Sequence, residues 1–372
     1  MPDLKQGVRP SDDRGAVTTL VAVLLAFGVL LGISAFVVDL GRAHLEHRTV
    51  QNAADQAARA VAQQCAERST GCASNGTAVT AATSISGANS FDGSTSVTSV
   101  CGAGTLGVCS SSVPAASMCR SVPAARVNTY ARVTTTTRTG SGASSITPIF
   151  MFGGSGMQSD ACAQAIWGPA AGVPVQFPFI IPICSYNSIG SPIIHDFVPN
   201  DPLQTCTIAT LNGTLTFNQV VKGFSYVRLP AGSASCSVPV QLAVGDVLER
   251  EPSTAQLCGN QIEAKLTSWL GKPMWLPVAT SLYCTGSANA CKTGQGSYQF
   301  KVASFVRYTM TGFKLQSREG GTPPAGGWKA ASCTSSGACL MGTFTRGVNP
   351  DSTVSNDPST PSLGVFAVTQ IP

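Results

Sequence analysis

The longest run of apolar positions lies near the amino terminus and ends at a charged residue. Residues Ala16 to Val38 are twenty-three consecutive residues without a charged side chain. At about 1.5 Å per residue, a helix of this length measures about 35 Å, which is enough to cross the hydrocarbon core of a membrane. We therefore predict a transmembrane helix over 16–38. Asp39 marks its exit, because a carboxylate is costly inside hydrocarbon.

The basic residues before this run predict its orientation. Lys5, Arg9 and Arg14 precede it, and basic residues near the segment end favour the cytoplasmic side, so residues 1–15 are expected in the cytoplasm. A cleaved signal peptide is the alternative. Its apolar region would be shorter, however, and Ile33-Ser34-Ala35 places a bulky residue where a cleavage site needs a small one. The expected protein is therefore a single-pass membrane protein with an extracytoplasmic remainder.

A helical pattern continues past the membrane to residue 68, interrupted only by Gly41. Apolar residues recur at helical spacing on one face, and Asp55 and Arg59 stand four apart as a favourable pair on another. This face consists of Val50, Ala53, Ala54, Ala57 and Val61. Small residues suit close packing, either on the chain's own domain or in an intermolecular bundle. Gly28 and Gly32 form one G-x-x-x-G, which would allow self-association of membrane helices or be a chance spacing.

Strand-like segments dominate the rest of the chain. The Thr-rich stretch 128–139 and the stretch 159–169 predict two paired strands within a small helix-packed sheet domain over 69–168. The Gly/Pro cluster at 168–174 indicates a boundary. Beyond it, short strand-like segments predict a mainly β domain over 175–372, with one helix at 256–270. The predicted fold class is α+β, with a long amino-terminal helix, a small sheet and a disulfide-stapled β ectodomain.

Composition adds the compartment and removes one class of partner. Charged residues make up 11% of the chain, and the net charge of +5 is spread without the basic stripe that nucleic-acid binding needs. The 14 cysteines include no C-x-x-C pair, and three histidines are too few for an ordinary Cys/His zinc site, so disulfides in an oxidising compartment are expected. Pairing in sequence order is the simplest hypothesis for the second domain: Cys184 with Cys206, Cys236 with Cys258, Cys284 with Cys291, and Cys333 with Cys339.

The segment 13–62 resembles the amino-terminal segment of Tad/Flp pilus-assembly proteins of the TadE/TadG-like family. Three motifs carry the resemblance: Arg14-Gly15 before the apolar run, Asp39-Leu40-Gly41-Arg42 at its exit, and Gln51-Asn52-Ala53-Ala54-Asp55 with its alanine tail. The resemblance implies a single-pass membrane protein of a type IVb-like pilus or tight-adherence apparatus. Its implied partners are pilin, pseudopilin or secretion-platform proteins. The resemblance does not imply an enzyme, and no cofactor is expected. It implies a pilin-like arrangement of a helix and a small sheet.

One departure from the family pattern concerns processing. TadE-type pseudopilins carry a glutamate five residues after the processing glycine, whereas the fifth residue after Gly15 is Leu20. The resemblance therefore favours a TadG-like, uncleaved anchor.

The sequence contains no complete motif for a catalytic site. His195 is the only histidine beyond the helix, and it would have to serve any Ser-His-Asp triad with Asp196, but no G-x-S-x-G elbow is present. It is expected on a surface loop. A carboxylate pair for glycoside cleavage would come from Asp246, Glu249, Glu251 and Glu263, although solvated charges are the simpler interpretation.

Metal sites are equally weak. The D-x-S-x-S match at 92–96 lacks the preceding apolar strand of a von Willebrand A metal site, and His44 and His47 have no third ligand nearby. We predict a non-catalytic membrane-anchored component of a Tad pilus. An anchored protein that binds cell-wall polymer and a wall-directed hydrolase using His195 are the alternatives.

Overall fold

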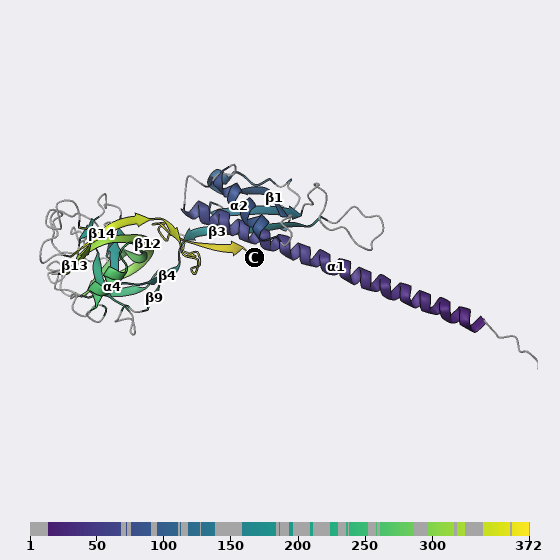
Figure 1. Cartoon of the computed structure of the whole chain (residues 1–372). Helices are drawn as coiled ribbons and strands as arrows, with labels where there is room; N and C mark the ends of the chain where they lie inside the picture. Colours follow the sequence, from purple (N-terminus) through teal and green to yellow (C-terminus); the bar gives the residue numbers. More distant parts are fainter. Residues whose placement is uncertain are drawn as a thin grey trace, which may run out of the picture.

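The structure is a computed structural model. It describes residues 14–67, 72, 76–90, 95–110, 112, 118–126, 128–137, 158–183, 186, 193–195, 209–210, 224–229, 236, 238–251, 258, 261–285, 297–315, 318–323, 338–357 and 359–371. One helix, α1 (Arg14–Glu67), contains 54 residues and, at 1.5 Å per residue, measures roughly 80 Å. Figure 1 shows its amino-terminal half projecting away from the rest of the molecule.

The first sheet packs against the carboxyl-terminal part of α1. Its strand order is β1-β2-β3-β16-β15, and all neighbouring pairs are antiparallel except the parallel pair β15–β16. The strands are β1 (Thr95–Gly102), β2 (Tyr130–Thr137), β3 (Asp160–Pro169), β15 (Gly347–Val348) and β16 (Val365–Ile371). The expected pairing of the Thr-rich strand with the following alanine-rich strand is thus confirmed.

Alternation along β3 decides which side chains meet the helix. Ala161, Ala163 and Ala165 share a buried cluster with the alanine face of α1, so Cys162 and Gln164 lie on the opposite side of the sheet. Small side chains on both elements let helix and sheet approach closely. The Thr135 hydroxyl donates a 3.2 Å hydrogen bond to the main-chain oxygen of Val50 across this contact.

A second helix, α2 (Thr77–Ala88), and short 3-10 turns η1 (Gly104–Leu106) and η3 (Ala124–Arg126) complete this part of the molecule. Ala78 and Ala82 of α2 pack into the same cluster as α1. The Ser/Ala/Gly/Thr-rich stretch 69–121 carries no strong helix or strand pattern, and the sequence predicted neither α2 nor β1. The alanines of α2 form a buried helical face. The low hydrophobicity of the surrounding Ser/Thr-rich stretch conceals this face in the sequence.

The second body is mainly β. Its large sheet has the order β6-β14-β12-β10-β8-β5-β11-β7, with β13 paired to β12 and a further pairing between β11 and β12, and β4 pairs with β9. The elements are β4 (Gly172–Val175), β5 (Phe179–Pro182), β6 (Ile193–His195), β7 (Ala209–Thr210), β8 (Ser225–Arg228), β9 (Val240–Ala243), β10 (Val247–Arg250), α4 (Ile262–Ser268), β11 (Pro273–Thr285), β12 (Ser297–Leu315), β13 (Arg318–Gly321) and β14 (Ala338–Thr345). The α+β class is confirmed. Within the described residues, the helix expected over 256–270 occupies 262–268.

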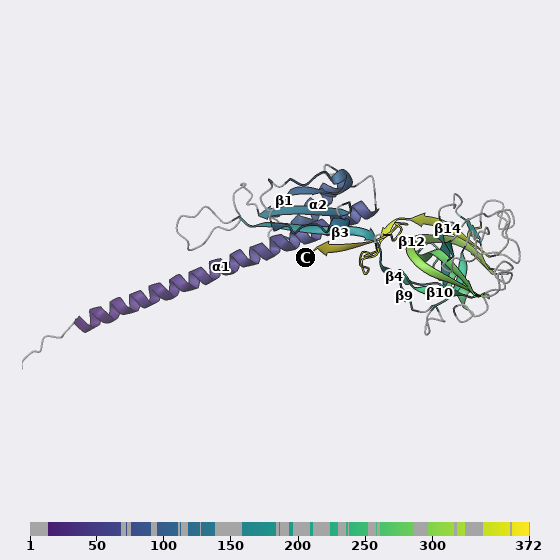
Figure 2. The same cartoon turned by 180° about the vertical axis from the view of Figure 1, so that it is seen from behind.

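The connection between the two bodies differs from the expected order of domains. The chain leaves the first sheet after β3, builds the second body, and returns through β15 and β16, which pairs with β3 from Pro169 to Gln164. The last strand was assigned by sequence to the second domain because nothing local marks its partner. Figures 1 and 2 show β3 and the yellow carboxyl-terminal strand side by side next to α1, with the β-rich body beyond them.

The two bodies share a core at this crossing. Val365 and Ala367 of β16 pack in one cluster with Phe300 and Phe305 of β12, and Ala170 forms a β-bridge with Val354. Because a continuous apolar core joins them, the second body is held at a fixed position relative to α1.

Candidate functional site

The side chains on the amino-terminal half of α1 are mostly exposed. Leu24, Leu30 and Phe36 are each more than half exposed, and this helix is long and apolar enough to cross a membrane by its length and composition. Gly28 and Gly32 lie on this stretch with no atom of the described chain near the position a Cβ would take. Their side of the helix is therefore open to lipid or to another helix.

The predicted membrane exit, Asp39 to Arg42, is a continuous part of the same helix. Gly41 does not interrupt it, Arg42 is exposed, and Asp39 is buried. Beyond this point Leu40 and Leu45 remain 58% and 60% exposed, although they lie past the uncharged run. Exposed leucines there give the exit segment an apolar surface of its own.

The alanine face meets the sheet of the same chain. Ala53 and Ala57 have no exposed surface, whereas Asn52, on the other side of the helix, is exposed. Of the two arrangements left open by the sequence, packing on the chain's own domain is the one seen. The bundle alternative would need a different face of the helix.

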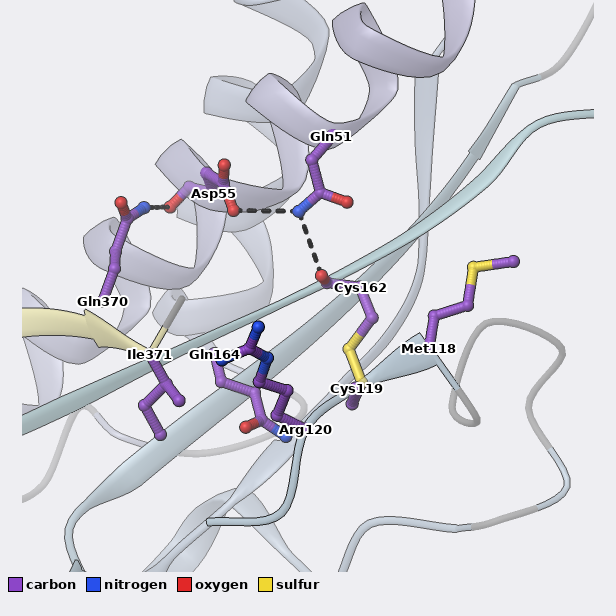
Figure 3. A pocket seen from close by; sticks show the side chains of 9 residues that line it. All are labelled: Gln51, Asp55, Met118, Cys119, Arg120, Cys162, Gln164, Gln370 and Ile371. Carbon is purple, nitrogen blue, oxygen red and sulfur yellow. Dashed lines mark hydrogen bonds between the residues drawn. A yellow bond between two sulfur atoms is a disulfide. The ribbon is translucent and has the colours of Figure 1, made fainter. Parts of the chain in front are cut away.

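Gln51 and Asp55 connect α1 to the edge of the sheet. The side-chain nitrogen of Gln51 donates to Asp55 Oδ1 at 3.0 Å and to the main-chain oxygen of Cys162 in β3 at 3.1 Å. The amide of Gln370 in β16 donates to the main-chain oxygen of Asp55 at 2.8 Å. Figure 3 shows these three bonds on the helix side of β3.

An open cavity of about 320 Å³ lies at this junction. It is lined by Gln51 and Asp55 of α1, Cys162 and Gln164 of β3, Gln370 and Ile371 of β16, and the loop residues Met118, Cys119 and Arg120. In Figure 3 the side chains of Gln51 and Asp55 lie on one side of β3, and those of Gln164 and Arg120 lie on the other. The cavity therefore reaches both faces of the sheet around its edge.

Burial and hydrogen bonding act in opposite directions on Asp55. Loss of solvent raises the pKa of its carboxyl, and the hydrogen bond from Gln51 partly offsets that rise. The expected ion pair with Arg59 is not among those formed in the described chain, where Arg228 pairs with Glu249 and Glu251. The Asp55 carboxyl turns toward Gln51, so the simple i, i+4 reading was wrong.

Four disulfides join described cysteines. They link Cys65 to Cys72, Cys101 to Cys109, Cys119 to Cys162, and Cys236 to Cys258. Cys339 in β14 is also disulfide-bonded. Of the other cysteines named for sequential pairing, Cys184, Cys206, Cys291 and Cys333 lie outside the described residues, and so do the pairs that include Cys284 and Cys339. Those pairings stay predictions.

The residues considered for catalysis are scattered. His195 lies on strand β6, paired with β14, and not on a loop as expected, while Asp196 lies outside the described residues. Glu249 and Glu251 contact Arg228, and Asp246 accepts a hydrogen bond from the Ala243 main-chain nitrogen in a turn. These carboxylates are thus engaged in ordinary surface contacts.

The candidate metal ligands are similarly dispersed. His44 and His47 are exposed on α1, and His47 Nδ1 lies 3.2 Å from the Ser159 hydroxyl. Among the described residues, no three His, Cys, Asp or Glu side chains gather as metal ligands would. Asp92 to Ser94 of the D-x-S-x-S match lie outside the described residues.

Sequence reasoning did not find Gln164, Gln370 or the Cys119–Cys162 link. Cys119 and Cys162 are 43 residues apart, and Gln370 reaches Asp55 from the far end of the chain. Only the strand pairing brings them together. The sole sequence signal was a glutamine within an alanine-rich strand, at 164, where a polar residue interrupts small apolar ones.

The comparisons with known proteins bear on α1. Residues 15–64 match the Tad family, described as Flp pilus-assembly TadE/G-like. No curated protein and no solved structure matches the chain. The match covers the bare half of α1, its exit and its alanine face, and it confirms the resemblance seen in the motifs. Residues 15–64 of this chain are thus similar to the TadE/G-like segment of Flp pilus-assembly proteins.

Proposed function

We propose that the protein is a non-catalytic, membrane-anchored component of a Tad pilus or tight-adherence apparatus, in which α1 positions an extracytoplasmic body relative to the membrane. The family match supports a role in pilus assembly. The partners proposed are pilin, pseudopilin or secretion-platform proteins.

The observation that carries the proposal is the continuity of α1. One helix has an exposed apolar half and a half that is packed on the first sheet, with no break between them. A protein that only needed an anchor would require no such rigid connection. A rigid connection suits a part that must hold a domain at a set height and angle above a membrane.

The proposed orientation places the amino terminus in the cytoplasm. Lys5, Arg9 and Arg14 support this side, and the disulfides of the remainder favour an oxidising compartment. Asp39 then lies near the outer interface, and residues 40–49, most of them exposed, form a collar between membrane and sheet. This collar carries Leu40 and Leu45, which are exposed apolar side chains available to a neighbouring subunit.

The test is site-specific photocrosslinking in the native host. A photoreactive amino acid replaces Leu45 on the collar, and a matched control replaces Val247, which is 49% exposed on the second body. We expect Leu45 to capture a pilin, a pseudopilin or a platform protein and Val247 not to capture it. Normal piliation in a clean deletion strain, or the same capture from both positions, would count against the proposal.

A further inference from the structure

A second open cavity lies where the two bodies meet. Its volume is about 660 Å³, within the range of about 300–1,000 Å³ that is typical of small-molecule sites. The β4–β9 ribbon, β11, β12 and the loop before β16, residues 355–357 and 359–361, line this cavity. Figures 1 and 2 show β4 beside the yellow segment that precedes the last strand, between the two bodies. Ligand sites are common at such junctions.

Both strands of the β11–β12 pair carry an extra residue at this cavity. The register between the strands skips Thr280 in β11 and Ala303 in β12, so neither residue has a partner within that pair. Both line the cavity. A bulge breaks the alternation of a strand and re-aims a side chain, and bulges are common beside functional sites. Thr280 is half-buried, and within the described chain its hydroxyl makes no hydrogen bond.

One cation and one anion line the cavity, Lys301 of β12 and Asp357 of the loop. The ion pairs among the described residues are made by Arg228, so these two charges do not touch each other. Hydrogen bonds from Ser359 are the main cause that lowers the pKa of the Asp357 carboxyl, and the positive charge of Lys301 lowers it further. The two charges therefore lie within electrostatic reach but remain separate. Because they balance, the lining favours a ligand without net charge.

Hydrogen bonds within the loop before β16 fix its shape beside the cavity. The Ser355 hydroxyl oxygen lies 2.8 Å from the Thr360 hydroxyl oxygen and accepts a 3.3 Å bond from the Asp357 main-chain nitrogen. Asp357 Oδ1 accepts bonds from the main-chain nitrogen and the hydroxyl of Ser359 at 2.8 and 2.6 Å. Among the described residues Asp357 Oδ2 has no donor. The loop is thus preformed, and Oδ2 is available to a ligand.

A neutral sugar has the chemistry that this lining needs. Sugar hydroxyls both donate and accept, so they match the Lys301 ammonium, which only donates, and the Asp357 carboxylate, which only accepts. The Thr280 hydroxyl does both. Small and aliphatic side chains such as Val244 and Val302 supply the rest of the lining and suit the C–H face of a sugar ring. A peptide fits less well, because it binds mainly through main-chain bonds along a strand edge, whereas the polar groups here are side chains.

We propose that the cavity between the two bodies binds a neutral oligosaccharide. The protein then has a further function, attachment to a glycan, beside the positioning of its body above a membrane. The inference does not rest on the proposed pilus role, because the cavity, the paired bulges and the separate charges are properties of this chain alone. The glycan belongs either to the cell's own envelope or to a surface to which the cell attaches, and both sources offer the same chemistry.

The first experiment measures binding of the full chain, in lipid nanodiscs, to an array of neutral tri- to hexasaccharides of glucose, galactose, mannose and N-acetylglucosamine. The array also carries uronic-acid counterparts and uncharged hexapeptides. We expect saturable binding to a neutral oligosaccharide, at least tenfold tighter than to its uronic-acid counterpart. A tenfold rise in salt should change this affinity less than twofold, because the ligand is uncharged. Binding to charged sugars or peptides alone, or to nothing on the array, would overturn the proposal.

The matched variants are Thr280→Val in the cavity and Thr343→Val outside it. Thr343 is exposed on β14, and valine keeps the shape of threonine without its hydroxyl. We expect Thr280→Val, and likewise Lys301→Met, to weaken binding of the best array sugar at least fivefold, and Thr343→Val to leave it unchanged. Melting temperatures show that each variant is folded. Undiminished binding by both folded cavity variants, or an equal loss in Thr343→Val, would refute the assigned site.

The second experiment locates the sugar and identifies its source. A photoreactive form of the best array sugar is crosslinked to the full chain, and peptide mapping should place the link in β9, β12 or the loop before β16. A link confined to other parts of the chain would contradict the proposal. Polysaccharide from the native host's envelope, and polysaccharide from a surface that the host colonises, are then compared as affinity matrices. Retention of the wild type and not of Lys301→Met identifies the source, and retention by neither matrix would count against the proposal.

Discussion

The side-chain amide of Gln370 donates a 2.8 Å hydrogen bond to the main-chain oxygen of Asp55, and so connects the last strand to the first helix. The two residues are 315 positions apart, and the whole second body is built between them. Because β16 is needed to complete the first sheet, the two bodies depend on each other. Helix α1 is thereby held by strands that lie far apart in the sequence.

The alanine face of α1 should not tolerate a larger side chain. Ala57 has no exposed surface and packs in the cluster that joins α1 to β3. We expect Ala57→Leu to lower the free energy of unfolding by about 1–3 kcal/mol, because extra methyl groups in a packed core force neighbours apart. Chemical unfolding of the full chain in detergent micelles measures this change.

Ala88 at the end of α2 is exposed and provides the control for helix propensity and added hydrophobicity. Ala88→Leu should change the free energy of unfolding by no more than about 0.5 kcal/mol. Equal stability of the Ala57→Leu protein and the wild type would mean that the helix and sheet are not in close contact.

Asp55 should make stability depend on pH in an unusual direction. Burial raises the pKa of its carboxyl above the ordinary value of 3.8, so the folded state favours the neutral form. The stability that this gives is present below pH 3.8 and is lost as the pH rises through the raised pKa. Asp55→Asn keeps the acceptor for Gln51 but cannot ionise, so its advantage over the wild type should grow as the pH is raised from 3 to 7.

Asp357 predicts the opposite sign and serves as the matched control. Hydrogen bonds from the side chain and main chain of Ser359 lower the pKa of its carboxyl. Its contribution is present above 3.8 and is lost as the pH falls through the lowered pKa. The stability of Asp357→Asn relative to the wild type should therefore fall as the pH rises. Parallel pH profiles for the two variants would show that Asp55 is no more buried than Asp357.

The features that the sequence predicted well are those with local periodicity. The uncharged run 16–38, the alanine spacing after it and the Thr-rich strand each carry their own pattern, and the structure contains α1, β2 and β3 at those places. The alanine face of α2 shares that periodicity but lies within a Ser/Thr-rich stretch that resembles a loop. Composition misled there because alanine packing needs little hydrophobic area.

The candidate site was less predictable because it is made by strands distant in sequence. Gln51 and Asp55 are singled out by their motif, but Gln164 and Gln370 have none. Nothing near Val365 to Ile371 indicates that this strand crosses back to β3, since its partner lies about two hundred residues earlier. Non-local pairing of this kind is set by the complete fold and not by local preference.

The disulfides of the first domain should differ in their effect on stability. In the chain-entropy account, a link that closes a longer loop restricts the unfolded chain more. The Cys119–Cys162 link spans 43 residues and the Cys101–Cys109 link spans 8. Removing the first by a double alanine substitution should cost about 4 kcal/mol, and removing the second about 2.5 kcal/mol.

Unfolding by urea in detergent micelles, with all other cysteines intact, ranks the two double variants. Mass mapping of the remaining links is the control, because it shows that no new pair has formed. A larger loss for the 101–109 variant would indicate that local strand pairing of β1, and not loop closure, dominates.

Two tyrosines, Tyr308, which is buried, and Tyr186, which is half-buried, should respond oppositely to loss of the hydroxyl. Tyr308 of β12 has no exposed surface, and its hydroxyl has no hydrogen-bond partner within the described chain. Burial raises its pKa above the ordinary value of 10, so it remains neutral in any usable buffer. Tyr308→Phe should stabilise the fold by about 1 kcal/mol, because it removes an unpaired polar group without creating a cavity. In contrast, the Tyr186 hydroxyl donates a 2.8 Å hydrogen bond to the Leu363 main-chain oxygen.

Tyr186→Phe therefore leaves a carbonyl without its donor and should cost about 1 kcal/mol. Thermal and urea unfolding of both variants in the same detergent show whether each substitution raises or lowers the free energy of unfolding. Destabilisation by both substitutions would show that the Tyr308 hydroxyl does have a partner, for which an ordered water is the natural choice. If Tyr308→Phe raises stability while Tyr186→Phe lowers it, the core under β12 contains no water beside the Tyr308 hydroxyl. The aromatic and aliphatic lining of this core implies that result.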